Sequence, residues 1–80
     1  MFGAFSKKRF IIGAKQVKNA IRNGKAAKVY IASDCDSEIS TPVKELADIN
    51  NISVVFISTR KELGEMCGID VKASCAAEAL

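Results

Sequence analysis

Residues 28–57 read KVYIASDCDSEISTPVKELADINNISVVFI. The two ends of this stretch, 28–33 and 52–57, are short apolar runs with β-branched and aromatic side chains, which is typical of buried strands. Between them, apolar residues recur at the spacing of a helix and predict its inner stripe, at Val43, Leu46, Ala47 and Ile49. The stretch therefore predicts a strand, a helix and a second strand.

The ends of this helix are indicated by its polar residues. Ser40 or Thr41 can serve as the N-cap, with Pro42 at the first helical position, where its missing N–H costs nothing. Residues 50–51 are both asparagine and predict the end of the helix. Because 52–57 is nearly all apolar, we expect helices to cover both faces of that strand.

Similar signals continue on both sides. Residues 13–23 predict a helix stopped by Gly24, and 10–12 form a brief strand or lead into that helix. Thr59 and Glu62 have the spacing of a capping box. They predict a helix over 60–66, with Leu63 and Met66 inward and Gly68 at its end, and the tail 73–79 then forms a last strand. Alternating helices and strands predict one α/β domain over residues 1–80, with a sheet covered on both faces.

Basic and acidic side chains are segregated along the chain. Eight of the twelve basic residues lie within the first 33 positions, which hold no acid, and all nine carboxylates lie from Asp34 onward. The net charge of +3 hides this split. An acid-free basic segment with apolar residues threaded through it indicates a folded surface that meets a polyanion. Its cations are Lys7, Lys8, Arg9, Lys15, Lys18, Arg22, Lys25 and Lys28.

Composition counts against several other classes of protein. The chain has no histidine, so the usual general base is missing and a zinc site is not expected. Cys35, Cys67 and Cys75 are odd in number and widely spaced, which predicts free thiols in a reducing cytoplasm rather than a disulfide framework. No apolar run is long enough for a membrane span. We expect a cytoplasmic, non-enzymatic monomer without metal or cofactor.

The helix over 13–23 is the strongest candidate for recognition. Two parallel rows at spacing i, i+3, i+7 follow its exposed side: the cations Lys15, Lys18 and Arg22, and the amides Gln16, Asn19 and Asn23. Cations neutralise phosphates, and amides can read base edges. A solvated basic face is the simpler interpretation of one helix alone. The neighbouring Lys25 and Lys28 and the absence of acids favour nucleic acid.

Three later features are ambiguous when each is taken alone. Arg60 begins a helix and reads first as ordinary surface charge. Ile69 and Val71 lie in a turn, where apolar residues usually fold back onto the core, but outward-facing ones could pack against an unstacked base. The carboxylates of Asp34, Asp36 and Glu38 are explained more simply by capping and solvation than by a metal site.

Taken together, these segments resemble the kink-turn-binding ribosomal protein family (the L-seven-Ae / L-thirty-e type), in particular its small bacterial branch. The resemblance covers about residues 10–75 in order. It is carried by the segments Ile12–Gln16, Asn23–Ala26, Val29–Asp34, Arg60–Gly64 and Cys67–Val71.

The resemblance implies an α/β/α sandwich around a mixed sheet of about four strands, and binding to the kink-turn, a sharp bend in RNA. It implies that the helix from Gly13 enters the groove at the kink, that Arg60 contacts the backbone, and that Ile69, Asp70 and Val71 pack on an extruded base. The family motif Gly-x-Asn-Glu-x-x-Lys differs here at three positions. Lys15 stands for Asn, Gln16 for Glu and Asn19 for Lys, beside Lys18.

Two alternatives remain open at this point. The chain could be an integral ribosomal protein that ignores free kink-turns, or a protein-interaction module on the same fold. In the first case the ribosome would be the partner. The second predicts weak RNA binding and a contiguous apolar surface.

Overall fold

The computed structural model describes residues 10–80. In chain order, its elements are β1 (Phe10–Ile12), α2 (Ala14–Arg22), β2 (Ala26–Ala32), α3 (Ser37–Ile49), β3 (Ser53–Ile57), α4 (Arg60–Met66) and β4 (Cys75–Ala79). The helices among these residues are too short and too polar to cross a bilayer.

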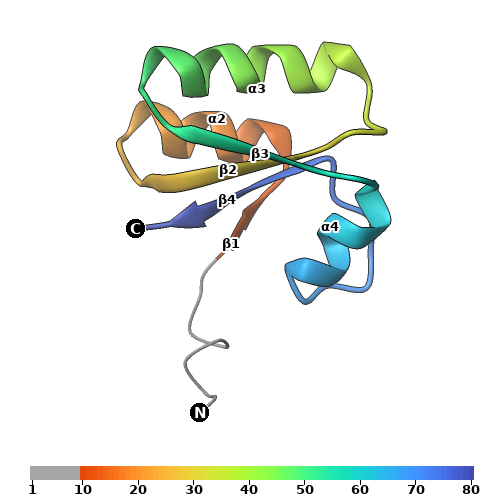
Figure 1. The fold of residues 1–80 in the computed structure, drawn as a ribbon. Coiled ribbons are helices and arrows are strands. Elements are labelled where there is room, and N and C mark those ends of the chain that lie inside the picture. The colour runs from red at the N-terminus through yellow and green to blue at the C-terminus, as the bar shows by residue number, and fades with distance from the viewer. Residues whose placement is uncertain (1–9) are drawn as a thin grey trace.

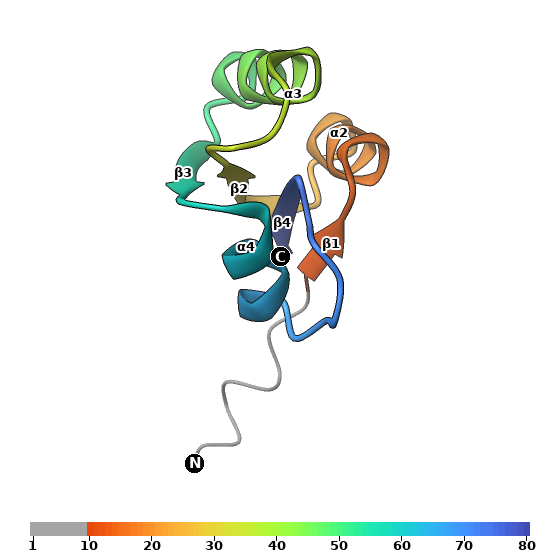
Figure 2. The same ribbon diagram turned by 90° about the vertical axis from the view of Figure 1, so that its right-hand side faces the viewer.

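The strands form one four-stranded mixed sheet in the order β1-β4-β2-β3. β2 and β3 pair in parallel, as the helix between them requires, whereas β4 is antiparallel to both of its neighbours. Helices α2 and α3 cover one face of the sheet and α4 covers the other (Figures 1 and 2). The predicted α/β/α sandwich is confirmed.

The hydrophobic core has two parts, one on each face of the sheet. Val17 and Ile21 of α2 and Val43 and Ala47 of α3 pack on Val29, Ile31, Cys75 and Ala77. On the other face, Leu63 of α4 packs with Ala32, Ala73 and Ala76. The alternating side chains of β4 thus enter both core clusters.

The alanine-rich tail is a central strand. Ala76 and Ala77 are completely buried although alanine is a poor strand former. Hydrogen bonding to β1 on one side and β2 on the other overrides that preference. The strand predicted over 73–79 is confirmed in the narrower range of β4. β2 in turn begins at Ala26, before the predicted Lys28, because Ala26 pairs with Ala79 across a bulge.

The predicted start of the central helix is wrong. α3 begins at Ser37 with Asp36 as its N-cap, so Pro42 lies inside the helix rather than at its first position. The Asp36 carbonyl accepts the N–H groups of Ile39 and Ser40 at 2.9 and 3.0 Å. Ile39 packs against the core, and this tertiary contact favours an extra N-terminal turn over the local preference of proline.

Three further expectations about burial are wrong. Ile49, predicted on the inner stripe of the central helix, is 76% exposed at the last position of α3, where the helix has passed the core. β3 is an edge strand, and Val55 and Phe56 are 36% and 52% exposed, so helices do not cover both of its faces. Met66 in the last turn of α4 is 40% exposed, whereas Leu63 is fully buried. A seven-residue helix presents little more than one side chain to the sheet, and Leu63 takes that position.

Candidate nucleic-acid interface

Four segments of the chain meet at one end of the sheet, where its strands begin or end. β1, β2 and β3 all end there and β4 begins there, because β4 runs antiparallel to its neighbours. The start of α2, the loop after β2, the start of α4 and the loop before β4 therefore lie together at this edge (Figures 1 and 2). We call this end of the sheet the recognition edge. The residues on its four segments that bear on binding are Gly13, Lys15, Gln16, Asp34, Arg60, Ile69, Asp70 and Val71.

Gly13 sets the start of α2 at the recognition edge. Its φ of 102° and ψ of 143° are accessible to glycine but strained for other residues. Its N–H donates to the Cys75 carbonyl at 3.1 Å, and its own carbonyl accepts the Val17 N–H at 2.9 Å. The first of these bonds joins the start of α2 to the strand that follows the 68–74 loop.

The N-terminus of α2 is electrostatically positive. The helix has no side-chain N-cap hydrogen bond and no acidic residue in its first turn. The exposed Lys15 and Gln16 lie in that turn. Because the dipole and Lys15 add positive potential at the same end, an anion bound there would be stabilised by both.

The structure divides the cations predicted to share one row on α2. Lys15 is exposed at the start of the helix, and the amides Gln16 and Asn19 are exposed as well. Lys18 is half-buried and, with Arg22, lines a hollow against α3 beside Glu45. Lys18 and Arg22 thus lie along the α2–α3 groove, away from the first turn.

Arg60 is held at the recognition edge by main-chain hydrogen bonds from two sides. Its N–H donates to Asp34 Oδ1 at 2.8 Å, and its carbonyl accepts the Ala73 N–H at 3.1 Å. Its guanidinium Nε also lies 3.5 Å from Asp34 Oδ1. In the same first turn of α4, Thr59 Oγ1 accepts the Glu62 N–H at 3.0 Å, which confirms the predicted Thr59 cap.

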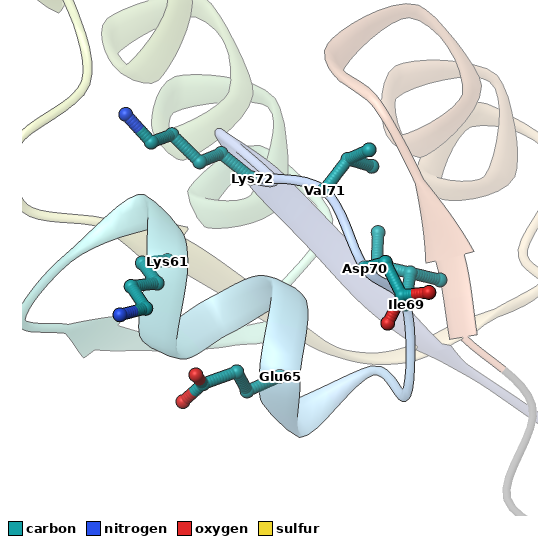
Figure 3. Close-up of a pocket in the computed structure, with 6 residues that line it drawn as sticks. All are labelled: Lys61, Glu65, Ile69, Asp70, Val71 and Lys72. Atoms are coloured by element: carbon teal, nitrogen blue, oxygen red, sulfur yellow. The ribbon is translucent and has the colours of Figure 1, made fainter.

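A surface pocket of about 310 Å³ is lined by side chains of α4 and of the loop before β4. Lys61 and Glu65 project from α4, and the loop contributes Ile69, Asp70, Val71 and Lys72 (Figure 3). Ile69 is half-buried against the Leu63 cluster, whereas the Val71 side chain is 67% exposed. The expectation that apolar loop residues fold onto the core thus fits Ile69 in part and does not fit Val71.

Other predicted residues lie elsewhere. Lys25 follows α2 at the opposite edge of the sheet, where its carbonyl accepts the N–H of Leu80 at 3.0 Å. Lys28 lies on β2 between Ser53 and Glu78. The structure does not bring either lysine to the recognition edge. Lys7, Lys8 and Arg9 lie outside the described residues.

Burial favours the protonated thiol at two of the cysteines, Cys67 and Cys75. Burial raises the pKa of Cys75 to about 11, and the nearby Cys35 adds to the shift while Lys18 opposes it. Burial also raises the pKa of Cys67. Both shifts work against a thiolate nucleophile, since only the deprotonated sulfur is reactive. The described residues form no cluster of side chains suited to a metal ion.

The sequence analysis missed two residues that shape this edge. Capping and solvation are the roles expected of Asp34; it does accept the first N–H of α4, but its contact with the Arg60 guanidinium was not expected. Gly64 was assigned no role, although the 68–74 loop lies directly against it and the Ile69 N–H donates to its carbonyl at 3.0 Å. A glycine inside a short predicted helix was the available signal, because an interior glycine usually has a packing reason.

Comparisons with known proteins were made on sequence and on structure. The sequence profile of the Ribosomal protein L7Ae/L30e/S12e/Gadd45 family matches residues 4–79. An RNA-binding protein of Caldanaerobacter subterraneus subsp. tengcongensis is 46% identical over 88% of this chain and 85% of its own length. One of Geobacillus kaustophilus is 38% identical over 86% of this chain and 84% of its own length.

Solved structures show the same fold. The Giardia lamblia 15.5kD RNA binding protein superposes with a TM-score of 0.84 at 27% identity, over 90% of this chain and 61% of that chain. A protein with unknown function from Bacillus halodurans C superposes with a TM-score of 0.81 at 21% identity, over 88% of this chain and 70% of that chain. By its matched profile and its relatives, this chain belongs to the Ribosomal protein L7Ae/L30e/S12e/Gadd45 family.

Proposed function

We propose that this protein binds RNA and, more specifically, recognises kink-turns and stabilises their bent form without catalysis. The observation that carries the proposal is the composition of the recognition edge. It combines the positive start of α2, the start of α4 with the anchored Arg60, and the loop before β4 with the exposed Val71, three segments that meet at one end of the sheet. The names of the two relatives support the broader part of the proposal, RNA binding.

The physical properties of RNA explain why such an edge suits a kink. A regular A-form helix has a deep, narrow major groove that side chains cannot read, so a protein must find a distortion. A kink opens the groove and crowds phosphates, which raises the local negative potential. Lys15 and Gln16 at the positive end of α2 could then contact base edges and phosphates together.

The other residues would contact the flanks of the kink. Arg60 would contact backbone phosphates, and Val71 with the partly exposed Ile69 would pack against an extruded base. Lys18 and Arg22 would neutralise phosphates along the α2–α3 groove. Lys25 and Lys28 lie away from this edge, so we assign them to long-range electrostatic attraction rather than direct contact.

Stabilisation follows from differential binding. RNA exchanges between extended and bent conformers, and a protein that binds the bent one more tightly shifts the population toward it. No reacting group is needed for this mechanism. We propose a cytoplasmic monomer whose partner is a kink-turn in ribosomal RNA or in a riboswitch, with the ribosome as one place of action.

A binding experiment with two RNAs tests the proposal. One RNA carries a kink-turn with its sheared G·A pairs, and the other has those pairs replaced by Watson–Crick pairs. We expect tighter binding to the first, with affinity that falls steeply as salt rises. Equal affinity for both would leave only generic polyanion binding and would refute kink-turn recognition.

The two alternatives make different predictions. An integral ribosomal protein would sediment stoichiometrically with ribosomes and ignore the isolated kink-turn. An interaction module needs a contiguous apolar surface. Val55 and Phe56 are exposed at the edge strand, but neighbouring strand residues point to opposite faces of a sheet. These two side chains therefore do not supply one continuous patch.

A further inference from the structure

We infer that Asp34 is a positioning residue for RNA binding: it fixes Arg60 at the start of α4 so that the guanidinium presents its outer edge to a phosphate. The inference rests on the proposed function, and it assigns a role to a carboxylate that would otherwise only repel RNA. It starts from an unusual arrangement, in which one carboxylate oxygen contacts both the main chain and the side chain of the same arginine.

The two contacts constrain Arg60 at both ends of its side chain. Asp34 Oδ1 accepts the Arg60 N–H at 2.8 Å, which fixes the main chain at the first residue of α4. The same oxygen lies 3.5 Å from Nε, which brings the flexible side chain back over its own backbone. The main-chain hydrogen bond fixes the start of the side chain, and the ion-pair contact at Nε, which is not a hydrogen bond, reduces its rotational freedom before RNA arrives.

The geometry of the guanidinium group determines which of its nitrogen atoms can bind a phosphate. The Nε atom is shielded from solvent, so it cannot itself reach a phosphate. The group is planar, and the edge formed by its two Nη nitrogens points away from Nε. That edge has the fork geometry that binds phosphate oxygens in a bidentate manner. The Arg60 side chain is still 43% exposed, as this role requires.

The anchored arginine is also coupled to the base-packing loop. The Arg60 carbonyl accepts the N–H of Ala73, two residues after Val71. Asp34 follows β2, Arg60 begins α4, and Ala73 precedes β4, so a single residue ties together three segments of the recognition edge. Loss of the Asp34 contact should therefore affect Arg60 first and the loop second.

Whether loss of the Asp34 charge weakens or tightens RNA binding distinguishes a positioning role from simple electrostatic repulsion. A carboxylate near a polyanion opposes binding, so removing its charge should tighten binding if Asp34 has no other role. If Asp34 positions Arg60, removing the charge should instead weaken binding to the kink-turn. Asp34→Asn is the sharper variant, because its amide oxygen can still accept the Arg60 N–H and preserve the start of α4.

The test is a double-mutant cycle on the full chain with the kink-turn RNA and its Watson–Crick counterpart. The variants are Asp34→Asn, Asp34→Ala, Arg60→Ala and the Asp34→Asn/Arg60→Ala pair. Glu38→Gln, which neutralises an exposed carboxylate in the first turn of α3, is the matched control. Thermal unfolding of each variant reports whether the fold is kept.

We expect Asp34→Asn to bind the kink-turn about 3- to 10-fold more weakly, with no further loss when Arg60 is already alanine. Glu38→Gln should bind as well as the original chain or slightly better. A kink-turn affinity for folded Asp34→Asn that equals or exceeds that of the original chain would overturn the inference. If the original chain itself does not distinguish the two RNAs, the proposed function fails, and the positioning role fails with it.

Discussion

The carbonyl oxygen of Val71 occupies the space that a Cβ atom on Gly64 would need. The main chain of the 68–74 loop thus lies flat against α4, and the Ile69 N–H donates to the Gly64 carbonyl at 3.0 Å. This close approach sets the position of the exposed Val71 side chain relative to Arg60. The close approach at Gly64 therefore helps to shape the recognition edge, beside the contacts of Asp34 and Arg60.

We predict that Gly64→Ala moves this loop. The added methyl group must displace main-chain atoms, so the free energy of unfolding should fall by about 1–3 kcal/mol. Kink-turn affinity should fall as well, because Ile69 and Val71 lose their positions. Gly24→Ala is the control: it has open space and a φ of +69°, so it should cost about 1 kcal/mol in stability without changing affinity. An unchanged RNA affinity for Gly64→Ala would contradict this account of the loop.

Two lysines of the basic segment should differ in their effect on binding. Lys15 lies in the first turn of α2, whereas Lys25 lies at the opposite end of the sheet, where its carbonyl accepts the Leu80 N–H before β2 begins. If Lys15 contacts a base, Lys15→Ala should lose about 1–3 kcal/mol of kink-turn binding, roughly 5- to 150-fold. Lys25→Ala should lower the affinities for the kink-turn and for the Watson–Crick RNA equally and slightly. Isothermal titration calorimetry at two salt concentrations distinguishes the base contact from the general electrostatic effect. If the two variants lose equal binding free energy, Lys15 is a general phosphate contact.

The exposed apolar residues provide a second matched pair. Val71 and Leu80 are 67% and 83% exposed, so substitution by serine should leave the stability of both variants nearly unchanged. Val71→Ser should weaken kink-turn binding by about 1 kcal/mol, because it removes the apolar contact with an extruded base. Leu80→Ser, beside Lys25 at the opposite end of the sheet, should bind normally. Fluorescence of a 2-aminopurine at the extruded position measures the contact directly; a response to Val71→Ser no larger than to Leu80→Ser would exclude it.

Alkaline pH should destabilise the fold through Cys75. Its pKa is raised from 9.0 to about 11 in the folded protein, since the thiol is fully buried. Between these two values the unfolded chain loses the proton and the folded chain keeps it, so unfolding becomes easier as pH rises. Stability is therefore fully present below about pH 9 and falls by on the order of 2 kcal/mol by about pH 11. Urea unfolding under reducing conditions should show a smaller decline for Cys75→Ala, and an identical decline would assign the effect to other groups.

Several features of the fold were predictable because they depend on near neighbours. The apolar spacing of α2, the Thr59 cap of α4 and the apolar run of β3 each involve residues no more than a few positions apart. Such local signals predict where helices and strands lie, but not the residues at which they begin and end. Pro42 was predicted at the start of α3, whereas packing of Ile39 moved the start to Ser37.

The sequence by itself thus determined the order of helices and strands after residue 12, the segregation of basic residues and the resemblance to a family that the comparisons confirm. Only the tertiary structure decided that the alanine-rich tail is a central strand, that Lys18 and Arg22 turn toward α3, and that Lys25 lies at the far edge. It also decided that Asp34 meets Arg60, which is 26 residues away. The physical reason is the sequence separation of the interacting residues. Helix periodicity and capping act between residues about four positions apart, whereas strand order and the meeting of loops depend on packing between segments far apart in the sequence.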